Sequence, residues 1–322
     1  MDFTKIIGHD RQIKSLKNSI KKGTVSHSYL FEGEEGLGKK AVAYAFSKAL
    51  LCEKAGDDAC NTCNSCIKFD SSNHPDFKII SPTNKNIKRE EIDNLIKDIS
   101  TLPFESSRKI YIIDDCHTLR LDSQNILLKT LEEPPEYVTI ILITSEKDKI
   151  IPTILSRCQI IKFYSLENSK IVNLLVEQHN MEINRAKFIA SFSKGSLKKS
   201  LELANSSDFF NMRDKIIDII DNLLRGHQIK AITSLDFFNE NKENAEEILD
   251  IMVYWFRDLL ILKETGNPKL LINQDMVEKL SSQTFVDLDR INDIIYRIDE
   301  TKINIKRNVN YNLLIETMLL SI

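Results

Sequence analysis

The sequence predicts an α/β domain with a parallel sheet, followed by a second half that consists of helices. Two apolar runs rich in Ile, Val and Tyr, at residues 108–115 and 137–145, predict strands buried on both faces, as strands of parallel sheets are. The segment between them, residues 119–133, has the apolar spacing of a helix and stops at Pro134-Pro135, where proline cannot continue a helix. Because strand and helix alternate, this part of the chain is predicted to be α/β.

The size and composition of the chain are those of an ordinary soluble protein. With 322 residues it is long enough for about two or three domains, each with its own core. Hydrophobic residues make up 42% and charged residues 28%, and a net charge of −3 gives no overall attraction to DNA or to an anionic membrane. The first residues lack the apolar core of a signal peptide, and no apolar run approaches the roughly 18 residues of a membrane span. We therefore expect a cytoplasmic protein that contacts no membrane and contacts DNA only locally.

The first predicted strand leads into a segment that looks like a phosphate-binding loop. Residues 27–33 are an apolar run that ends at glycine, and residues 39–51 are alanine-rich with helical spacing. In such a loop the glycines let backbone amides approach the anion, the helix N-terminus favours negative charge, and a lysine adds a positive charge. The matching residues are Gly33, Gly36, Gly38 and Lys39. The alternative interpretation is a glycine turn that only leads into a helix.

One position of this loop departs from the pattern. Lys40 stands where the pattern has a serine or threonine, whose hydroxyl normally holds Mg²⁺. An ammonium group has no acceptor, so it cannot coordinate a cation and would repel Mg²⁺. The sequence therefore predicts the shape of a phosphate loop without its metal ligand.

Two acidic residues follow the strand predicted at residues 108–115. Asp114 lies at the strand end, where phosphate-loop proteins place the carboxylate that holds Mg²⁺. The next position would carry a glutamate that orients the attacking water, but Asp115 is one methylene shorter. A misplacement of about 1 Å can lower a rate about a hundredfold, so the shorter side chain is a significant change. After Lys40, it is the second altered part of the hydrolytic apparatus. The alternative is that the acidic pair only caps a strand.

Four cysteines crowded into residues 52–66 predict a structural zinc site, called the knuckle below. Four thiolates satisfy tetrahedral Zn²⁺, and two successive Cys-x-x-Cys steps let a tight turn wrap the ion. An iron–sulfur cluster also takes four cysteines, but usually at other spacings, and redox thiols are the remaining alternative. The cysteines are Cys52, Cys60, Cys63 and Cys66; Cys116 and Cys158 lie too far along the chain to join them.

After about residue 163 the predicted elements are all helices. The helical pattern breaks at Gly195, at Gly226 and at residues 266–268. Trp255 lies within an apolar helical stripe and is predicted to be core. The segments with helical spacing are residues 169–180, 185–205, 212–226, 245–266, 283–305 and 310–322.

In this order, these motifs resemble one family. The segments that carry the likeness are IIGHDRQIKSLKNSI, HSYLFEGEEGLGKK, the knuckle, NHPDF, RKIYIIDDCHTLRLDSQNILLKTLEEPP, ILSRCQIIKF and NVNYNLLIETMLL. They resemble the delta-prime subunits of the bacterial DNA polymerase III clamp loader over nearly the whole chain, most strongly in residues 1–163. A lone Arg157 would be read as a solvated charge, but Ser156-Arg157-Cys158 together with an inserted knuckle is far more specific than a phosphate loop alone.

The resemblance implies an AAA+ fold in three parts. Residues 1–163 would form the α/β nucleotide-binding domain with the inserted knuckle, residues 164–207 a small helical lid, and residues 208–322 a helical collar through which subunits form a pentamer. The implied partners are the gamma/tau and delta subunits, the sliding clamp and, through the assembled complex, primer-template DNA. The complex would load the ring-shaped clamp on primed DNA within the polymerase holoenzyme.

The resemblance also implies roles for single residues. Delta-prime subunits commonly have degraded phosphate loops and act as a stationary partner, and Lys40 fits that type rather than the gamma/tau motor, which keeps the hydroxyl and an Asp-Glu pair. ATPase activity of the chain itself is therefore expected to be weak or absent, and binding of ATP or ADP at the altered loop is left open. Lys198 matches the lid arginine that senses nucleotide, with its charge but without its bidentate fork. Arg157 would act in trans at the ATP site of a neighbouring subunit.

Two other functions remain open on the sequence. The chain could be an active motor subunit of the gamma/tau type, with Asp115 as the base. It could also be a free-standing zinc-dependent DNA-binding module, although the acidic residues of the knuckle make a poor surface for phosphates.

Overall fold

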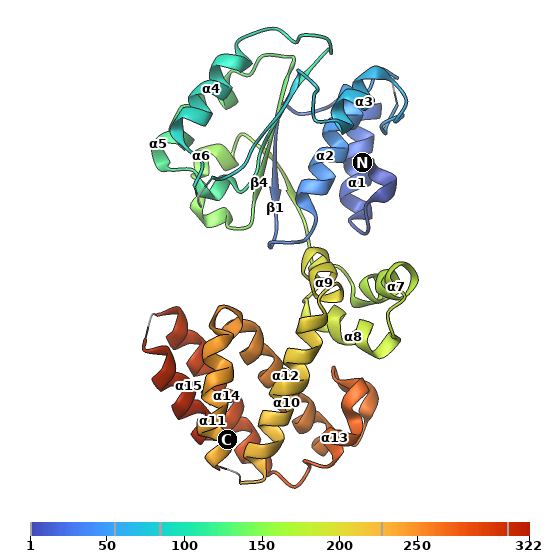
Figure 1. The fold of residues 1–322 in the computed structure, drawn as a ribbon. Coiled ribbons are helices and arrows are strands. Elements are labelled where there is room, and N and C mark those ends of the chain that lie inside the picture. The colour runs from blue at the N-terminus through green and yellow to red at the C-terminus, as the bar shows by residue number, and fades with distance from the viewer. Residues whose placement is uncertain (1, 55, 84–85, 227, 308) are drawn as a thin grey trace. The chain divides into compact units, whose positions relative to one another are not determined.

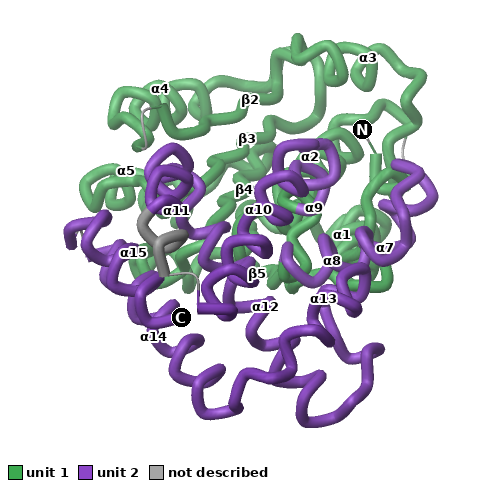
Figure 2. Tube along the Cα trace, turned by 60° about the horizontal axis from the view of Figure 1, so that its bottom comes forward, with its two compact units in different colours: residues 1–170, 194–199 green, residues 171–193, 200–322 purple. Residues whose placement is uncertain are grey.

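The computed structural model describes residues 2–54, 56–83, 86–226, 228–307 and 309–322. The chain divides into two compact units: unit 1 is residues 1–170 with 194–199, and unit 2 is residues 171–193 with 200–322 (Figure 2). The sheet belongs to unit 1, and the described residues of unit 2 form only helices and their connections. The predicted fold class, an α/β part followed by a helical part, is confirmed.

Unit 1 is built on a five-stranded parallel sheet with the strand order β2-β3-β4-β1-β5. All residues of β3 and β4 are buried, as the uninterrupted apolar runs predicted. The chain returns from β4 past β1 to form β5, so β1 lies between β4 and β5. This order matches the AAA+ fold that the resemblance implies. The strands are β1 (Ser28–Glu32), β2 (Phe77–Ile80), β3 (Lys109–Ile113), β4 (Val138–Thr144) and β5 (Gln159–Lys162).

Helices cover both faces of this sheet (Figure 1). Tyr29 and Phe31 of β1 pack in one core cluster with residues of α1, α2 and α3, whereas Leu30 packs in the other cluster with residues of α4, α5 and α6. Successive side chains of a strand point to opposite faces, so β1 contributes to both layers. The helices are α1 (Asp10–Lys21), α2 (Lys39–Leu51), α3 (Asn64–Asp70), α4 (Arg89–Ile99), α5 (Leu121–Glu132) and α6 (Pro152–Leu155).

The rest of the chain forms helices, of which α12 is the longest at 21 residues. Trp255 of α12 is fully buried, and its indole nitrogen donates to Gln283 Oε1 at 2.8 Å, so the prediction of a core residue is confirmed. None of the described helices is long and apolar enough to cross a membrane. The helices are α7 (Asn168–His179), α8 (Ile183–Phe192), α9 (Leu197–Ala204), α10 (Ser207–Leu224), α11 (Gln228–Glu240), α12 (Ala245–Thr265), α13 (Val277–Ser281), α14 (Leu288–Lys306) and α15 (Tyr311–Leu320).

A buried polar network connects α10 and α12 with the segment before α13. The guanidinium of Arg213, which is 1% exposed, donates to Asp275 at 2.6 and 2.7 Å and to Asn273 Oδ1 at 2.8 Å. The carboxylate of Asp258, fully buried, accepts the backbone amides of Ile272 and Asn273. These hydrogen bonds link the segment before α13 to α10 and α12, although Nε of Arg213 is buried without a hydrogen-bond partner.

Candidate functional site

The predicted phosphate loop occupies the turn between β1 and α2. Gly36 and Gly38 have φ of 78° and 88°, in a region that residues with a side chain rarely adopt. The first amides of α2 have no partner within the helix, and together with the helix dipole they favour an anion in front of the loop. The turn therefore has a geometry in which backbone amides can receive phosphate.

Lys39, the first residue of α2, folds back over this loop. Its ammonium donates to the carbonyl oxygens of Gly33 at 2.5 Å and of Glu34 at 2.6 Å. Burial lowers the pKa of Lys39, while the nearby carboxylates of Asp115 and Asp114 act in the opposite direction. The lysine thus bridges the loop at the place where a phosphate would compete with the two carbonyls.

Lys40 contacts the acidic residue that would otherwise hold a metal. Its Nζ lies 2.8 Å from Oδ2 of Asp114, directly after β3. The carboxylate side chain is 14% exposed and the lysine side chain 47%. Mg²⁺ requires oxygen ligands in near-ideal octahedral geometry, and an ammonium offers only donors and a repelling charge. These residues therefore do not fit the Mg²⁺ ion of an active phosphate-loop site.

Asp115 follows in a strained backbone conformation, with φ of 46°. Burial raises the pKa of its carboxyl group, and the neighbouring carboxylate of Asp114 raises it further. Asp115 is consequently protonated more easily than an ordinary aspartate.

The sequence reasoning missed polar residues at the same edge of the sheet. Thr144 ends β4, and its Oγ1 lies 3.5 Å from Nδ1 of His117, whose Nε2 lies 3.5 Å from Glu146. The carboxyl ends of parallel strands meet at one edge, where α/β proteins bind ligands, so polar residues after β4 were a usable signal. His9 was also missed: its Nε2 lies 2.7 Å from the carbonyl oxygen of Leu37 in the loop.

Residues 194–199 bring Lys198 to the loop within unit 1. The amide of Lys198 donates to the carbonyl oxygen of Gly36 at 3.2 Å, and its ammonium lies 3.2 Å from Glu35 Oε1. Gly36 also lies close to Ser196, because a Cβ at Gly36 would approach Ser196 Oγ to 2.2 Å. The lid position that resembles a nucleotide sensor is thus in contact with the loop backbone.

Arg157, between α6 and β5, makes its contacts away from the phosphate loop. Its guanidinium forms an ion pair with Glu132 at the end of α5, at 2.7 Å, and donates to the carbonyl oxygen of Thr153 at 2.9 Å. About a third of its side chain is exposed. The structure therefore brings Arg157 together with Glu132, a partner that the sequence reasoning missed.

The four cysteines of the knuckle converge on one point. All their Sγ atoms lie within 4.8 Å of one another, and Cys52–Cys63 and Cys60–Cys66 are each 4.0 Å apart. Tetrahedral Zn²⁺ with Zn–S bonds of about 2.3 Å requires sulfur atoms roughly 3.8 Å apart. Hydrogen bonds from Thr62 lower the pKa of Cys60 to about 5, which favours the thiolate that a metal needs. The donor set and spacing fit structural zinc.

Charged residues fasten the knuckle to the surrounding helices. Lys48 of α2, whose side chain is buried, donates to Asn61 and to Asp70, each at 2.6 Å. Lys17 of α1 forms an ion pair with Asp58 at 2.9 Å. The knuckle is therefore part of unit 1.

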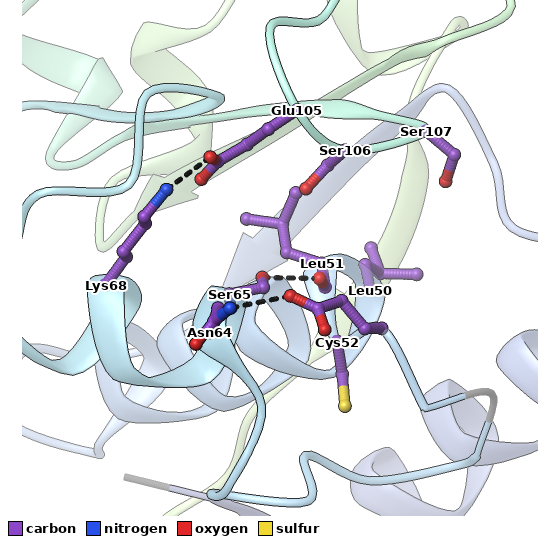
Figure 3. A pocket seen from close by; sticks show the side chains of 10 residues that line it. Leu50, Leu51, Cys52, Asn64, Ser65, Lys68, Glu105, Ser106 and Ser107 are labelled. Atoms are coloured by element: carbon purple, nitrogen blue, oxygen red, sulfur yellow. Dashed lines mark hydrogen bonds and ion pairs between the residues drawn. The ribbon is translucent and has the colours of Figure 1, made fainter.

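A hollow of about 520 Å³ adjoins the knuckle (Figure 3). Its polar groups satisfy one another: Ser65 donates through its amide to Glu53 at 3.0 Å and through its hydroxyl to Leu51 O at 2.6 Å, and Lys68 pairs with Glu105. A site for a polar ligand would need groups aimed into the hollow instead. We assign no ligand to it.

Comparisons with known proteins point to the replication machinery. A family profile described as "DNA polymerase III, delta subunit" matches residues 8–167. A second, "DNA polymerase III, delta subunit, C terminal", matches residues 207–322.

Relatives among characterised proteins carry related names. DNA polymerase III subunit delta' of Bacillus subtilis (strain 168) is 32% identical over 315 residues, which cover 96% of this chain and 94% of that protein. DNA polymerase III subunit tau of the same organism is 31% identical over 284 residues, 81% of this chain, and the match spans 50% of tau. DNA polymerase III subunit tau of Escherichia coli (strain K12) is 33% identical, over 64% of this chain and 33% of tau.

Solved structures with a similar course of the chain include a DNA polymerase III gamma subunit-related protein of Thermotoga maritima. It has a TM-score of 0.44 and 20% identity, and the match covers 96% of this chain and 97% of that one. The DNA clamp loader delta protein of Bacillus subtilis has a TM-score of 0.36 and 13% identity, over 96% of this chain and 98% of that one.

Proposed function

The chain belongs to the family of DNA polymerase III clamp-loader subunits, and on that premise we propose that it is a subunit of the delta-prime type that does not itself hydrolyse ATP. The observation that carries this proposal is the contact between Lys40 and Asp114 at 2.8 Å. The residue that replaces the metal-binding hydroxyl neutralises the carboxylate that would hold the same metal. A motor subunit depends on that metal for hydrolysis.

The proposed subunit has three parts and works within a pentamer. Residues 1–163 form the AAA+ domain, residues 164–207 the lid and residues 208–322 the collar; the start of a separate profile match at residue 207 supports the last boundary. The partners are gamma/tau and delta subunits, and the assembly loads the sliding clamp on primer-template DNA in the cytoplasm. The knuckle holds Zn²⁺ in a structural role, and Arg157 acts in trans at the neighbouring ATP site.

Assembly is the first test of this role. We expect the purified chain, mixed with gamma/tau and delta subunits, to form one complex whose mass by native mass spectrometry is that of a pentamer containing one copy of this chain. The chain alone is the control. If the mixture contains only complexes without this chain, the proposed role is wrong.

The isolated chain is expected to hydrolyse ATP far below the rate of about 1 s⁻¹ at the low end of typical enzymes. The reason is that Lys40 excludes the metal and Asp115 is short for the attacking water. The double variant Lys40→Thr, Asp115→Glu restores both groups and should be faster than wild type, measured as phosphate release with Mg²⁺. Lys39→Ala added to that variant is the control and should abolish the gain.

The competing function, an active motor of the gamma/tau type, makes the opposite prediction. The raised pKa of Asp115 is the observation in its favour, because a carboxyl closer to neutral pKa is a better base. Wild-type ATPase as fast as that of the double variant, and lost in Lys39→Ala, would favour the motor.

A further inference from the structure

We propose that the phosphate loop of this chain takes a nucleoside di- or triphosphate without magnesium, with the Lys40 ammonium acting as a built-in counter-cation. This inference rests on the proposed function, because it concerns the same degenerate site, and it states which chemical form of the ligand the site accepts.

Lys40 occupies the position of the metal as well as that of the metal's ligand. It is the second residue of α2, and Asp114 follows the core strand β3. In an active site a hydroxyl and a carboxylate approach one ion from two sides, each oxygen at about 2.0–2.1 Å from the metal or through water. Here Nζ and Oδ2 are in direct contact at 2.8 Å. No Mg²⁺ fits between them.

The Lys40 ammonium still has N–H donors that could bind a phosphate. It has three N–H donors, and the contact with Asp114 uses one of them. Its side chain is 47% exposed, so it is not enclosed in the core. We expect a phosphate held by the amides in front of α2 to lie within reach of the other two N–H donors of Lys40. In ordinary phosphate loops the preceding lysine contacts the phosphates in this way.

Two carboxylates around the loop are balanced without a divalent ion. Glu35 is paired with Lys198 at 3.2 Å, and Asp114 with Lys40. Lys39 remains as a positive charge that bridges two loop carbonyls. An added Mg²⁺ would have to displace Lys40 from Asp114 and would meet the repulsion of that ammonium and of the Lys39 ammonium.

The experiment measures binding of fluorescent ADP and ATP analogues to the purified full-length chain, once in EDTA and once in Mg²⁺. For wild type we expect dissociation constants that agree within about twofold in the two conditions. Lys40→Thr removes the counter-cation and supplies a hydroxyl, so it should bind about tenfold or more weakly than wild type in EDTA and recover in Mg²⁺. Lys39→Ala should abolish binding in both.

A direct metal measurement accompanies the binding curves. Mn²⁺ prefers the same oxygen ligands as Mg²⁺ and has a paramagnetic signal. With nucleotide present, Lys40→Thr should retain bound Mn²⁺, and wild type should leave Mn²⁺ with the free nucleotide. The matched control is Lys22→Thr, which removes one exposed lysine at the end of α1 and should behave as wild type.

Three results would overturn the proposal: no nucleotide binding by wild type in either condition, wild-type binding that Mg²⁺ strengthens about tenfold, or Lys40→Thr without dependence on the metal. None of them touches the proposed clamp-loader role, which is tested by assembly and by Arg157 in the complex. Conversely, a chain that fails to assemble can still bind nucleotide without magnesium.

Discussion

Arg157→Ala is expected to abolish most ATP turnover at the neighbouring site that we propose this chain serves in the reconstituted clamp loader. Hydrolysis develops charge on the phosphoryl oxygens, and an arginine delivered from a neighbouring chain stabilises it by about 10³- to 10⁵-fold in rate. The variant should fold and assemble as wild type, because the side chain is a third exposed and its ion pair with Glu132 lies at the surface. The measurements are the ATPase rate of the complex with DNA and clamp, and clamp loading.

The ion pair with Glu132 makes this prediction sharper. In the isolated chain the guanidinium is held by Glu132 at 2.7 Å and by Thr153 O at 2.9 Å, so it must release or share Glu132 to reach a neighbour's phosphate. Arg157→Lys should rescue only partly, because a lysine lacks the planar, bidentate fork. Glu132→Gln should retain most of the rate, because it keeps the arginine.

Arg11→Ala, which removes an exposed arginine from α1, is the matched control and should keep the full rate. Full DNA- and clamp-stimulated ATPase together with normal clamp loading by the Arg157→Ala complex would mean that Arg157 is an ordinary solvated charge. Loss of activity caused by failed assembly would show in the mass of the complex.

The fold was predictable where one local signal dominated. β3 and β4 are buried over their whole length, so their uninterrupted apolar runs identified them. The edge strands β2 and β5 were harder, because β2 has no fully buried residue and β5 has only one, Ile161. α11 was not predicted, and the helix expected from residue 283 begins at Leu288, after the cap residue Asp287. Short, exposed strands such as β2 and β5 leave little periodicity to detect.

At the site, the sequence revealed which residue types are present but not which residues are in contact. The missing hydroxyl at Lys40 is visible in the sequence, but its contact with Asp114 depends on α2 and β3 meeting in space. The pairing of Arg157 with Glu132 likewise depends on how the ends of α5 and α6 pack, although both segments were noticed as motifs. Residue types indicate the possible chemistry, whereas contacts between residues distant in sequence depend on how the helices and strands pack.

The second large effect is expected at the zinc knuckle. Purified reduced protein should contain about one equivalent of Zn²⁺, and Cys63→Ser should lose it, as measured by metal analysis. Apart from the polar contacts of Lys48 and Lys17, the knuckle has little to hold it together: its apolar cluster consists of Ala59 and the cysteines themselves, and residues 53–63 contain no helix or strand among those described. Structural zinc supplies apparent binding energies of about 10–16 kcal/mol at neutral pH, far more than a cluster of this size.

Loss of zinc should therefore unfold the knuckle while the sheet persists. The sheet rests on two large clusters of buried side chains, neither of which includes a knuckle cysteine, so Cys63→Ser should keep most of its secondary structure by circular dichroism. Limited proteolysis should then cut within residues 52–66, which wild type protects. The melting temperature should also fall, because Lys48 and Lys17 lose their knuckle partners Asn61 and Asp58.

Cys158→Ser is the matched control, because it removes a thiol outside the cluster and should retain the full zinc content. Acid should release the metal as the thiolates are protonated. Wild-type protein with less than about half an equivalent of zinc, or Cys63→Ser with an unchanged content, would show that the four thiols converge for a reason other than metal. In that case the hydrogen bonds of Lys48 and Lys17, rather than an ion, would have to account for the order of the knuckle.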